Sequence, residues 1–414
     1  MEVVKNLYLK LYLLVFGIYI YLNKGVAYTY LVEILWIIGF LILVFERKSF
    51  YIPINRKIKF IFFFLAISIV FIIRGMLQYS FIDLVRDSFI FQYSLFVFII
   101  FLFANKIESI WEFLFIIYKW LPLAALINFI LQYFVPAFES IAPFGGIPIL
   151  LYKNGDMGVQ ILVSTLLFML YPEKFSRKWK LFFAILVILD FLIFSAYSRS
   201  GMVSFLAGIF CFVVLNKDAQ MKSRTIQFIK YVPWFLLIVV PIYINIQVEE
   251  NFQGRAVGLN QILNNFSSVL GGTTDATSEN NVIWRLLWWA KILNYSFSFP
   301  NFFIGKGLGI NLAISDNIAT LDNTLRSPHN FHLNIMARFG VLIFIIWIFW
   351  LIILFKPLFK KQLTGRKLAL GCILLAFIIN ASFDVFLEGP MGAFPFWTFI
   401  GLFFLEKETQ EVLL

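Results

Sequence analysis

The chain has 414 residues, of which 61% are hydrophobic and 20% aromatic, and its formal net charge is +11. A mean hydropathy of +0.88 excludes an ordinary soluble domain. A charge of this size is also found in nucleic-acid-binding proteins, so the positions of the basic residues along the chain have to decide its meaning.

Apolar runs recur along the whole chain. A helix of about 20 apolar residues crosses the ~30 Å hydrocarbon layer of a bilayer. The predicted spans are 8–22, 28–45, 58–73, 88–104, 110–134, 158–171, 181–197, 200–215, 231–248, 335–355, 368–386 and 389–405. The sequence therefore predicts an all-α polytopic membrane protein with about twelve transmembrane helices.

The basic residues gather in short connections between these runs, at 46–57, 172–180, 216–230 and 356–367. With twelve spans, all four connections lie on the same side as the N-terminus, which is the positive-inside pattern. We therefore expect a multi-pass protein of the cell inner (cytoplasmic) membrane with both termini in the cytoplasm. The positive charge therefore reflects the orientation of the protein in the membrane, and no nucleic-acid partner is predicted.

Three regions follow from this topology. Residues 1–248 hold spans one to nine, 249–334 form one large external loop, and 335–414 hold spans ten to twelve and a cytoplasmic tail. Within the loop, Asn281–Asn294 has the apolar spacing of an amphipathic helix. The glycine-rich segment Gly305–Gly309 superficially resembles a phosphate loop, but it lacks the preceding strand and following Ser or Thr, so a turn is predicted.

Basic residues on the external side run against the positive-inside bias, which makes each of them a candidate for function. Arg199 lies in a tight break between two runs, and Arg285 lies on the amphipathic helix. Arg326 and Arg338 flank the start of the tenth span. A guanidinium matches phosphate oxygens in two places at once, so we expect these four to bind a diphosphate.

Structural roles remain as alternatives for three of these arginines. Arg285 could extend its guanidinium to the lipid headgroups, and Arg199 could be a topological charge at a hairpin. Arg338 could pair with Asp384, with Glu388 or with backbone carbonyls.

The only two histidines, His329 and His332, lie just before the tenth span. Imidazole exchanges a proton near neutral pH, so His329 is the predicted catalytic base of a glycosyl transfer, with Asn330 and His332 in support. The base would deprotonate an acceptor hydroxyl that attacks a sugar C1, while arginines hold the leaving diphosphate. Whether His329 or His332 is the base stays open. No metal and no cofactor are expected, because the acidic residues and the two cysteines show no ligand spacing.

Three motifs carry a family resemblance. The segment Ser327–Leu333, with Gly340 after it, resembles the His-Asn signature of the O-antigen polymerase and O-antigen ligase superfamily. Trp284–Trp288 with Ile304–Gly309 resembles that family's arginine helix and glycine turn, and Tyr197–Gly201 resembles its Ser-Arg hairpin. The resemblance covers roughly residues 180–350.

This resemblance implies a metal-independent membrane glycosyltransferase that uses undecaprenyl-diphosphate-linked glycans. By matching position, Arg199 and Arg285 would bind the donor diphosphate and His329 would activate the glycan acceptor. Arg326 and Arg338 are assigned to the diphosphate from their location only.

The composition, rich in Phe, Ile, Lys, Asn and Tyr, indicates AT-rich coding and favours a polymerase of oligosaccharide repeat units, such as those of O-antigen in lipopolysaccharide or of another surface polysaccharide. A flippase and a chain-length regulator would then be partners. An O-antigen ligase that transfers the glycan to lipid A core is the alternative. A lipid-linked sugar flippase or transporter is a further one, although charged groups in the spans are few.

Overall fold

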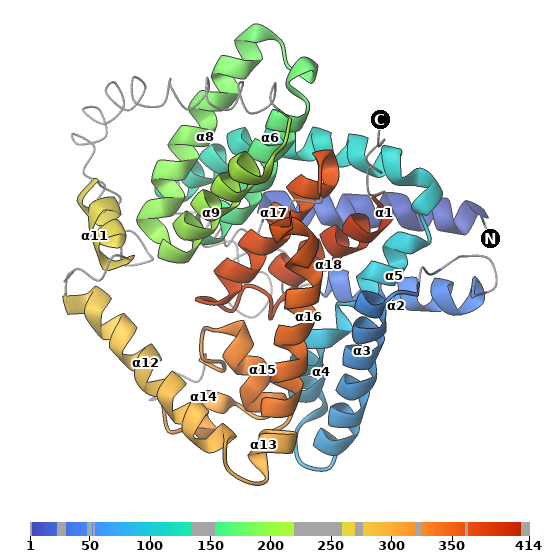
Figure 1. Ribbon diagram of the computed structural model, residues 1–414, viewed down its shortest axis with the longest axis vertical. Helices are drawn as coiled ribbons and strands as arrows, with labels where there is room; N and C mark the ends of the chain where they lie inside the picture. The colour runs from blue at the N-terminus through green and yellow to red at the C-terminus, as the bar shows by residue number, and fades with distance from the viewer. Residues whose placement is uncertain are drawn as a thin grey trace.

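The computed structural model describes residues 2–22, 30–47, 52, 54–134, 154–218, 259–269, 276–318, 325–360 and 363–406. Within these ranges every regular element is a helix and there is no strand, which confirms the predicted all-α class. The helices pack side by side (Figure 1), with α12 to α14 along the lower edge of that view.

The described residues form twenty helices and helical turns. They are α1 (Glu2–Leu22), α2 (Leu31–Phe45), α3 (Arg56–Gly75), α4 (Phe81–Gln92), α5 (Leu95–Phe101), η2 (Ala104–Lys106), α6 (Ile107–Phe134), η4 (Asn154–Asp156), α7 (Met157–Leu170), η5 (Pro172–Lys174), α8 (Arg177–Tyr197), α9 (Arg199–Leu215), α11 (Leu259–Val269), α12 (Ala276–Ser296), α13 (Asn301–Ile304), α14 (Leu312–Ser315), α15 (Phe331–Phe339), α16 (Val341–Phe359), α17 (Gly365–Ala381) and α18 (Pro390–Leu405).

Five described helices are long and apolar enough to cross a membrane, namely α1, α3, α6, α8 and α16. The pair α4 and α5 would add a sixth span, and α2, α7, α9 and α18 are shorter apolar helices. Eleven of the predicted runs overlap helices, and the ninth, 231–248, lies outside the described residues. The number of twelve spans stays a prediction.

Two predicted spans are not single straight helices. The run 88–104 is divided between α4 and α5, which bend by 52° at residues 93 and 94. The run 335–355 is divided at Gly340, where φ is +90°, and a Cβ atom there would lie 2.8 Å from the Phe302 carbonyl oxygen. A left-handed glycine ends a helix, so the short helix α15 is separate from α16. Both predictions were wrong in this detail.

The core of the bundle is apolar, and some of its buried polar groups form hydrogen bonds between helices. In α1, the Tyr12 hydroxyl lies 2.5 Å from the Thr398 hydroxyl of α18, which itself donates to the Phe394 carbonyl at 2.7 Å. The Tyr118 hydroxyl donates to Gln160 Oε1 at 2.8 Å, joining α6 to α7. Such bonds hold apolar helices together where the hydrophobic effect gives no preference for a neighbour.

Contacts between helix ends show which ends of the bundle coincide. The start of α7 touches the start of α9, because the Cβ position of Gly158 lies 2.7 Å from the Gly201 carbonyl oxygen. The segment after α7 touches the start of α17, where Arg366 donates to the Tyr171 hydroxyl. Helix α17 therefore ends at the same end of the bundle at which α7 and α9 begin. We call this end, formed by residues 154–158, 198–201 and 381–389, the insertion end.

The opposite end of the bundle collects charged connections. Arg366 forms two bonds to the Glu108 carboxylate, of 2.6 and 2.8 Å. Lys367 donates to the Glu406 carbonyl at 2.7 Å. The connections before α6, before α17 and after α18 thus share one end of the bundle, and the side of the membrane that this end faces stays a prediction.

Candidate functional site

Helix α12 positions Arg285. The structure extends the predicted amphipathic helix to Ala276–Ser296. Trp288 and Ile292 are fully buried on one face, whereas Leu286 and Leu287 on the other are more than half exposed. The spacing of four residues places Trp288 and Ile292 on one face of the helix. The predicted helix is therefore present, whereas its amphipathic character stays a prediction.

A buried carboxylate fastens α12 to the segment that follows it. Asp316 is 1% exposed, and its Oδ2 accepts from Trp288 Nε1 at 2.6 Å. Lys306 pairs with Asp316 Oδ1, and Lys291 donates to the Asp316 carbonyl oxygen. A carboxylate that is paired and hydrogen-bonded in this way tolerates burial, so Asp316 fixes how α12 is placed.

The histidine segment forms a tight turn before α15. His329 has φ = +52°, a left-handed conformation that costs a non-glycine residue roughly 1–3 kcal/mol. The Asn330 side chain accepts from Leu333 N–H at 3.0 Å and caps α15. Trp289 Nε1 donates to the Pro328 carbonyl at 2.7 Å. The turn is therefore held by α12 on one side and by a helix cap on the other.

The structure brings Arg285 and His329 to one place. Arg285 Nη1 donates to the Phe383 carbonyl at 3.2 Å, and His329 Nδ1 lies 4.0 Å from Asp384 Oδ1. The Trp284 ring meets the His329 ring edge-on, with centroids 5.8 Å apart. Residues 383 and 384 directly follow the end of α17, so the arginine helix and the histidine turn converge on the insertion end.

Arg199 begins α9 and therefore also lies at the insertion end. Ser198 caps the helix by accepting from Gly201 N–H at 3.1 Å. Asn265 of α11 donates to the Ser195 and Ala196 carbonyls at 2.8 and 2.9 Å, which places α11 beside this hairpin. The three predicted motifs thus share one end of the bundle, although only the histidine and arginine-helix motifs converge on the α17–α18 connection.

Arg338 has a different position from the one predicted. It is 2% exposed, and its Nη1 lies 2.7 Å from Asp87 Oδ2 and 3.1 Å from the Ile310 carbonyl, while Nε donates to Asn334 at 2.9 Å. These bonds tie α15 to α4 and to the segment before α14. Since the guanidinium is buried and bonded inside the protein, this geometry favours a structural role for Arg338 over the predicted binding of a diphosphate. Of the alternative partners, a backbone carbonyl is found, that of Ile310, while the carboxylate that pairs with Arg338 is Asp87.

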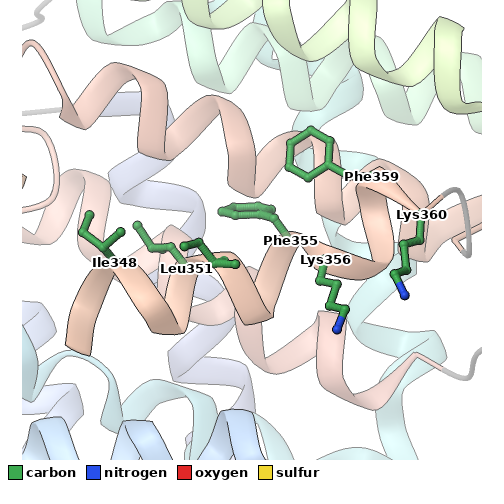
Figure 2. A pocket seen from close by; sticks show the side chains of 7 residues that line it. Ile348, Leu351, Phe355, Lys356, Phe359 and Lys360 are labelled. Carbon is green, nitrogen blue, oxygen red and sulfur yellow. The ribbon is translucent and has the colours of Figure 1, made fainter. Parts of the chain in front are cut away.

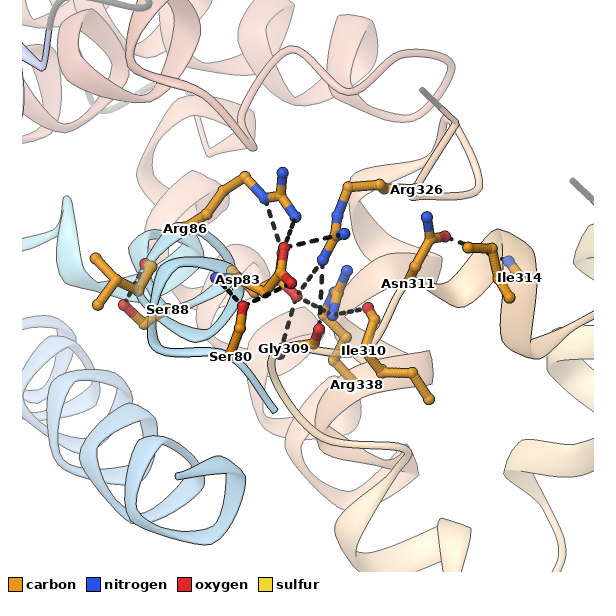
Figure 3. A network of polar contacts seen from close by, with 12 residues as sticks. Ser80, Asp83, Arg86, Ser88, Gly309, Ile310, Asn311, Ile314, Arg326 and Arg338 are labelled. Carbon is orange, nitrogen blue, oxygen red and sulfur yellow. Dashed lines mark hydrogen bonds and ion pairs between the residues drawn. The ribbon is translucent and has the colours of Figure 1, made fainter. Parts of the chain in front are cut away.

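Arg326 belongs to the same network (Figure 3). Its Nη1 lies 3.2 Å from Asp83 Oδ1, and its Nη2 lies 3.5 Å from Asp87 Oδ2. Arg86 pairs with Asp83 at 2.5 Å. Burial lowers the pKa of the Arg326 guanidinium. Three arginines thus share two aspartates, and Arg326 is committed to α4 in this structure.

The glycine segment 305–309 is a turn, as predicted. All three of its glycines have positive φ, and its N–H groups bond to the protein itself: Lys306 to the Ala337 carbonyl at 2.8 Å, and Gly307 to the Arg338 carbonyl at 2.9 Å. Gly309 N–H donates to Asp87 Oδ2 at 2.9 Å. A phosphate loop directs its N–H groups at a ligand, whereas this turn directs them at α15 and α4.

The geometry distinguishes the two histidines. His332 Nδ1 accepts from Trp347 Nε1 at 3.0 Å, and the ring also bonds to the Ile378 backbone. Burial lowers the pKa of His332 to about 4. Both ring nitrogens are committed to the packing of α15, α16 and α17. His329, with 29% of its side chain exposed, is the accessible imidazole.

Two carboxyl groups at the site were not predicted as site residues. Asp384 faces His329, and Glu388 bonds to the Ser327 side chain. Both were considered only as partners of Arg338. The sequence signal for them is weak, since a carboxylate at the end of an apolar run is common at any membrane surface.

A separate apolar cavity of about 430 Å³ lies along the second half of α16 (Figure 2). It is lined by Ile348, Leu351, Ile352, Phe355, Lys356, Phe359 and Lys360. With neither carboxylates nor imidazoles in its lining, it offers no groups for the chemistry predicted above. In the part of the chain that the structure describes, no three His, Cys, Asp or Glu side chains are grouped to hold a metal ion.

Residues 181–348 match the model of a family described as O-antigen ligase. This match supports a place for the chain in the O-antigen polymerase and ligase superfamily. The matched segment contains Arg199, Arg285 and His329, and the family implies an enzyme that transfers a glycan between a lipid-linked donor and an acceptor. No curated protein and no solved structure matches the chain.

Proposed function

We propose that this protein is a metal-independent glycosyltransferase that polymerises undecaprenyl-diphosphate-linked oligosaccharide repeat units at the outer face of the cytoplasmic membrane. The observation that carries the proposal is the convergence of Arg285 and His329 on residues 383 and 384. Arg285, a permanent cation, and His329, a titratable base, come from two separate motifs and contact the same connection between α17 and α18.

The reaction needs one proton acceptor and one anion-binding group. His329 takes the proton of an acceptor hydroxyl, the hydroxyl oxygen forms a bond to the sugar C1, and the bond from C1 to the diphosphate oxygen breaks. The lipid diphosphate leaves with the electron pair of that bond. Arg285, together with Arg199 at the same end of the bundle, stabilises the negative charge as it develops.

The site residues divide by their availability to substrate. Arg285 and His329 are partly exposed, whereas Arg338 is buried in an ion pair. We therefore assign the diphosphate to Arg285 and Arg199 and leave Arg326 and Arg338 to the network with Asp83 and Asp87.

A second candidate is the ligase reaction, in which the finished glycan passes to lipid A core or a similar acceptor. The description of the matched family favours it. The same groups would serve, because only the acceptor differs. In the polymerase reaction the partners are a flippase that supplies the repeat unit and a regulator of chain length.

A reconstitution experiment tests the function. Purified protein in liposomes receives a synthetic lipid-linked repeat unit, with or without a core-type acceptor, and the products are separated by size. A ladder made from the donor alone supports the polymerase. Transfer that requires the core acceptor supports the ligase, and no transfer to either acceptor contradicts both.

Variants assign the roles. His329→Ala and Arg285→Ala should each lower turnover at least about 100-fold, a typical loss for a general base or for a group that stabilises developing charge. Arg177→Ala is the matched control, because Arg177 is an exposed basic residue at the start of α8, next to η5. Turnover of the His329 or Arg285 variant equal to that of the control would contradict the assigned role.

A further inference from the structure

The connection between α17 and α18, residues 382–389, supplies two carboxyl groups to the site. Asp384 lies next to His329, and Glu388 lies four residues further along. Both fall outside the segment that matches the family model, which ends at residue 348. Their part in the site therefore has to be argued from the contacts of this chain.

Glu388 is joined to the histidine turn. The Ser327 hydroxyl, buried at 5% exposure, bonds to the Glu388 carboxyl. The Glu388 Oε1 atom is buried and has no hydrogen-bond partner among the described residues. A buried carboxyl oxygen without a donor is costly when the group is ionised, so the surroundings favour the neutral acid.

Other charged groups face Glu388 from each packed element. Arg338 of α15 favours the ionised carboxyl, whereas Asp87 of α4 and Asp384 of the same connection disfavour it. Burial is the largest influence and raises the pKa of Glu388 to about 7, although the Ser327 hydrogen bond and Arg338 act in the opposite direction. The carboxyl thus changes charge in the range in which an imidazole also titrates.

We propose that Glu388 is a positioning residue for His329. By holding Ser327, two residues before the imidazole, it fixes the left-handed turn from which His329 projects, and its ionisation changes the charge that His329 meets. Pro328 lies between the two residues, and its ring fixes φ, so a shift of Ser327 is passed on to His329.

The consequence is a coupled titration. At lower pH Glu388 is neutral, and the Asp384 carboxyl faces His329. Above pH 7 the ionised Glu388 adds a second negative charge, which favours the protonated imidazole. At the distances across such a site, one added charge shifts an imidazole pKa by roughly 0.3–1 unit.

Histidine-selective NMR measures this coupling without any substrate. The chain contains two histidines, so isotope-labelled protein in detergent gives two ring signals, and His329→Gln assigns them.

The variant Glu388→Gln keeps an acceptor for Ser327 but cannot ionise. We expect the His329 pKa to fall by 0.3–1 unit in this variant. Glu173→Gln, the same change at an exposed position, should leave the titration unchanged. Identical titration curves for the native chain and Glu388→Gln would overturn the proposal.

The kinetic test rests on the proposed function. In Glu388→Gln the rise of kcat with pH that follows the deprotonation of His329 should move to lower pH by the same 0.3–1 unit as the His329 pKa. Ser327→Ala and Glu388→Ala should lower kcat about tenfold or more with the KM of the lipid-linked donor unchanged, because the base is misplaced while the donor site is intact. Native kcat in both alanine variants would also overturn the proposal. If the NMR shift is present while the native protein transfers no glycan, the proposed function fails and the coupling stands.

Discussion

The buried ion pair between Arg338 and Asp87 gives the most decisive test of the fold around the site. The two side chains are 2% and 7% exposed, and their charged atoms lie 2.7 Å apart. Replacing Asp87 by Asn keeps an oxygen acceptor for Gly309 N–H but removes the negative charge, which leaves the Arg338 guanidinium buried with its main counter-charge lost. Breaking a buried pair in this way costs about 3–5 kcal/mol.

The assay is equilibrium unfolding by SDS titration in mixed micelles, read as a free energy of unfolding. The control is Asp83→Asn in the same network, since 37% of the Asp83 side chain is exposed and such a pair contributes at most about 1 kcal/mol. The double variant Asp87→Asn with Arg338→Met should lose less than the sum of the two single losses. The reasoning is refuted if Asp87→Asn costs no more than Asp83→Asn, or if the double variant is additive.

Three further predictions concern single residues around the site. Gly305→Ala should lower the free energy of unfolding more than Gly365→Ala in the same titration. Both glycines have φ near +50°, where an alanine is strained by about 1–2 kcal/mol, but only at position 305 would the Cβ lie 2.5 Å from the Arg338 backbone. Equal losses in the two variants would exclude this close approach. Because burial lowers the pKa of His332 to about 4 from 6.5, the neutral form stabilises the fold above pH 6.5, and this stability is lost as the pH falls towards 4. Between pH 7 and 5 the free energy of unfolding should fall by about 2 kcal/mol more in the native chain than in His332→Gln. Parallel pH profiles of the two proteins would refute this prediction. Asn330→Ala should lower the free energy of unfolding by about 1 kcal/mol through loss of the cap. Asn330→Ser, which keeps a capping oxygen, should have the stability and the turnover of the native chain. Native stability with reduced turnover in Asn330→Ser would instead indicate that Asn330 contacts substrate.

The sequence by itself determined the class of the protein and the positions of most helices. Whether a segment crosses a bilayer depends on the length of its own apolar run and on the charges that flank it. Both are local properties of the sequence. For the same reason the helix around Arg285 could be predicted, as could the turn at 305–309. The resemblance of the three motifs also lies in short segments that can be recognised without any fold.

Only the tertiary structure decided which charged residues are available to a ligand. Arg338 and Asp87 are 251 positions apart, and no local pattern joins them. His332 and His329 are three residues apart and look equivalent in the sequence, yet one ring is enclosed by α15, α16 and α17 while the other lies beside Trp284 and Asp384.

The positions at which the helices break were also decided only by the tertiary structure. Whether an apolar run continues through Gly340 depends on how closely α13 approaches it, which is a property of packing and not of the run itself. The cost of a buried charge depends likewise on what surrounds it in space, so the partners of Arg338, His332 and Glu388 were fixed only when distant segments came together.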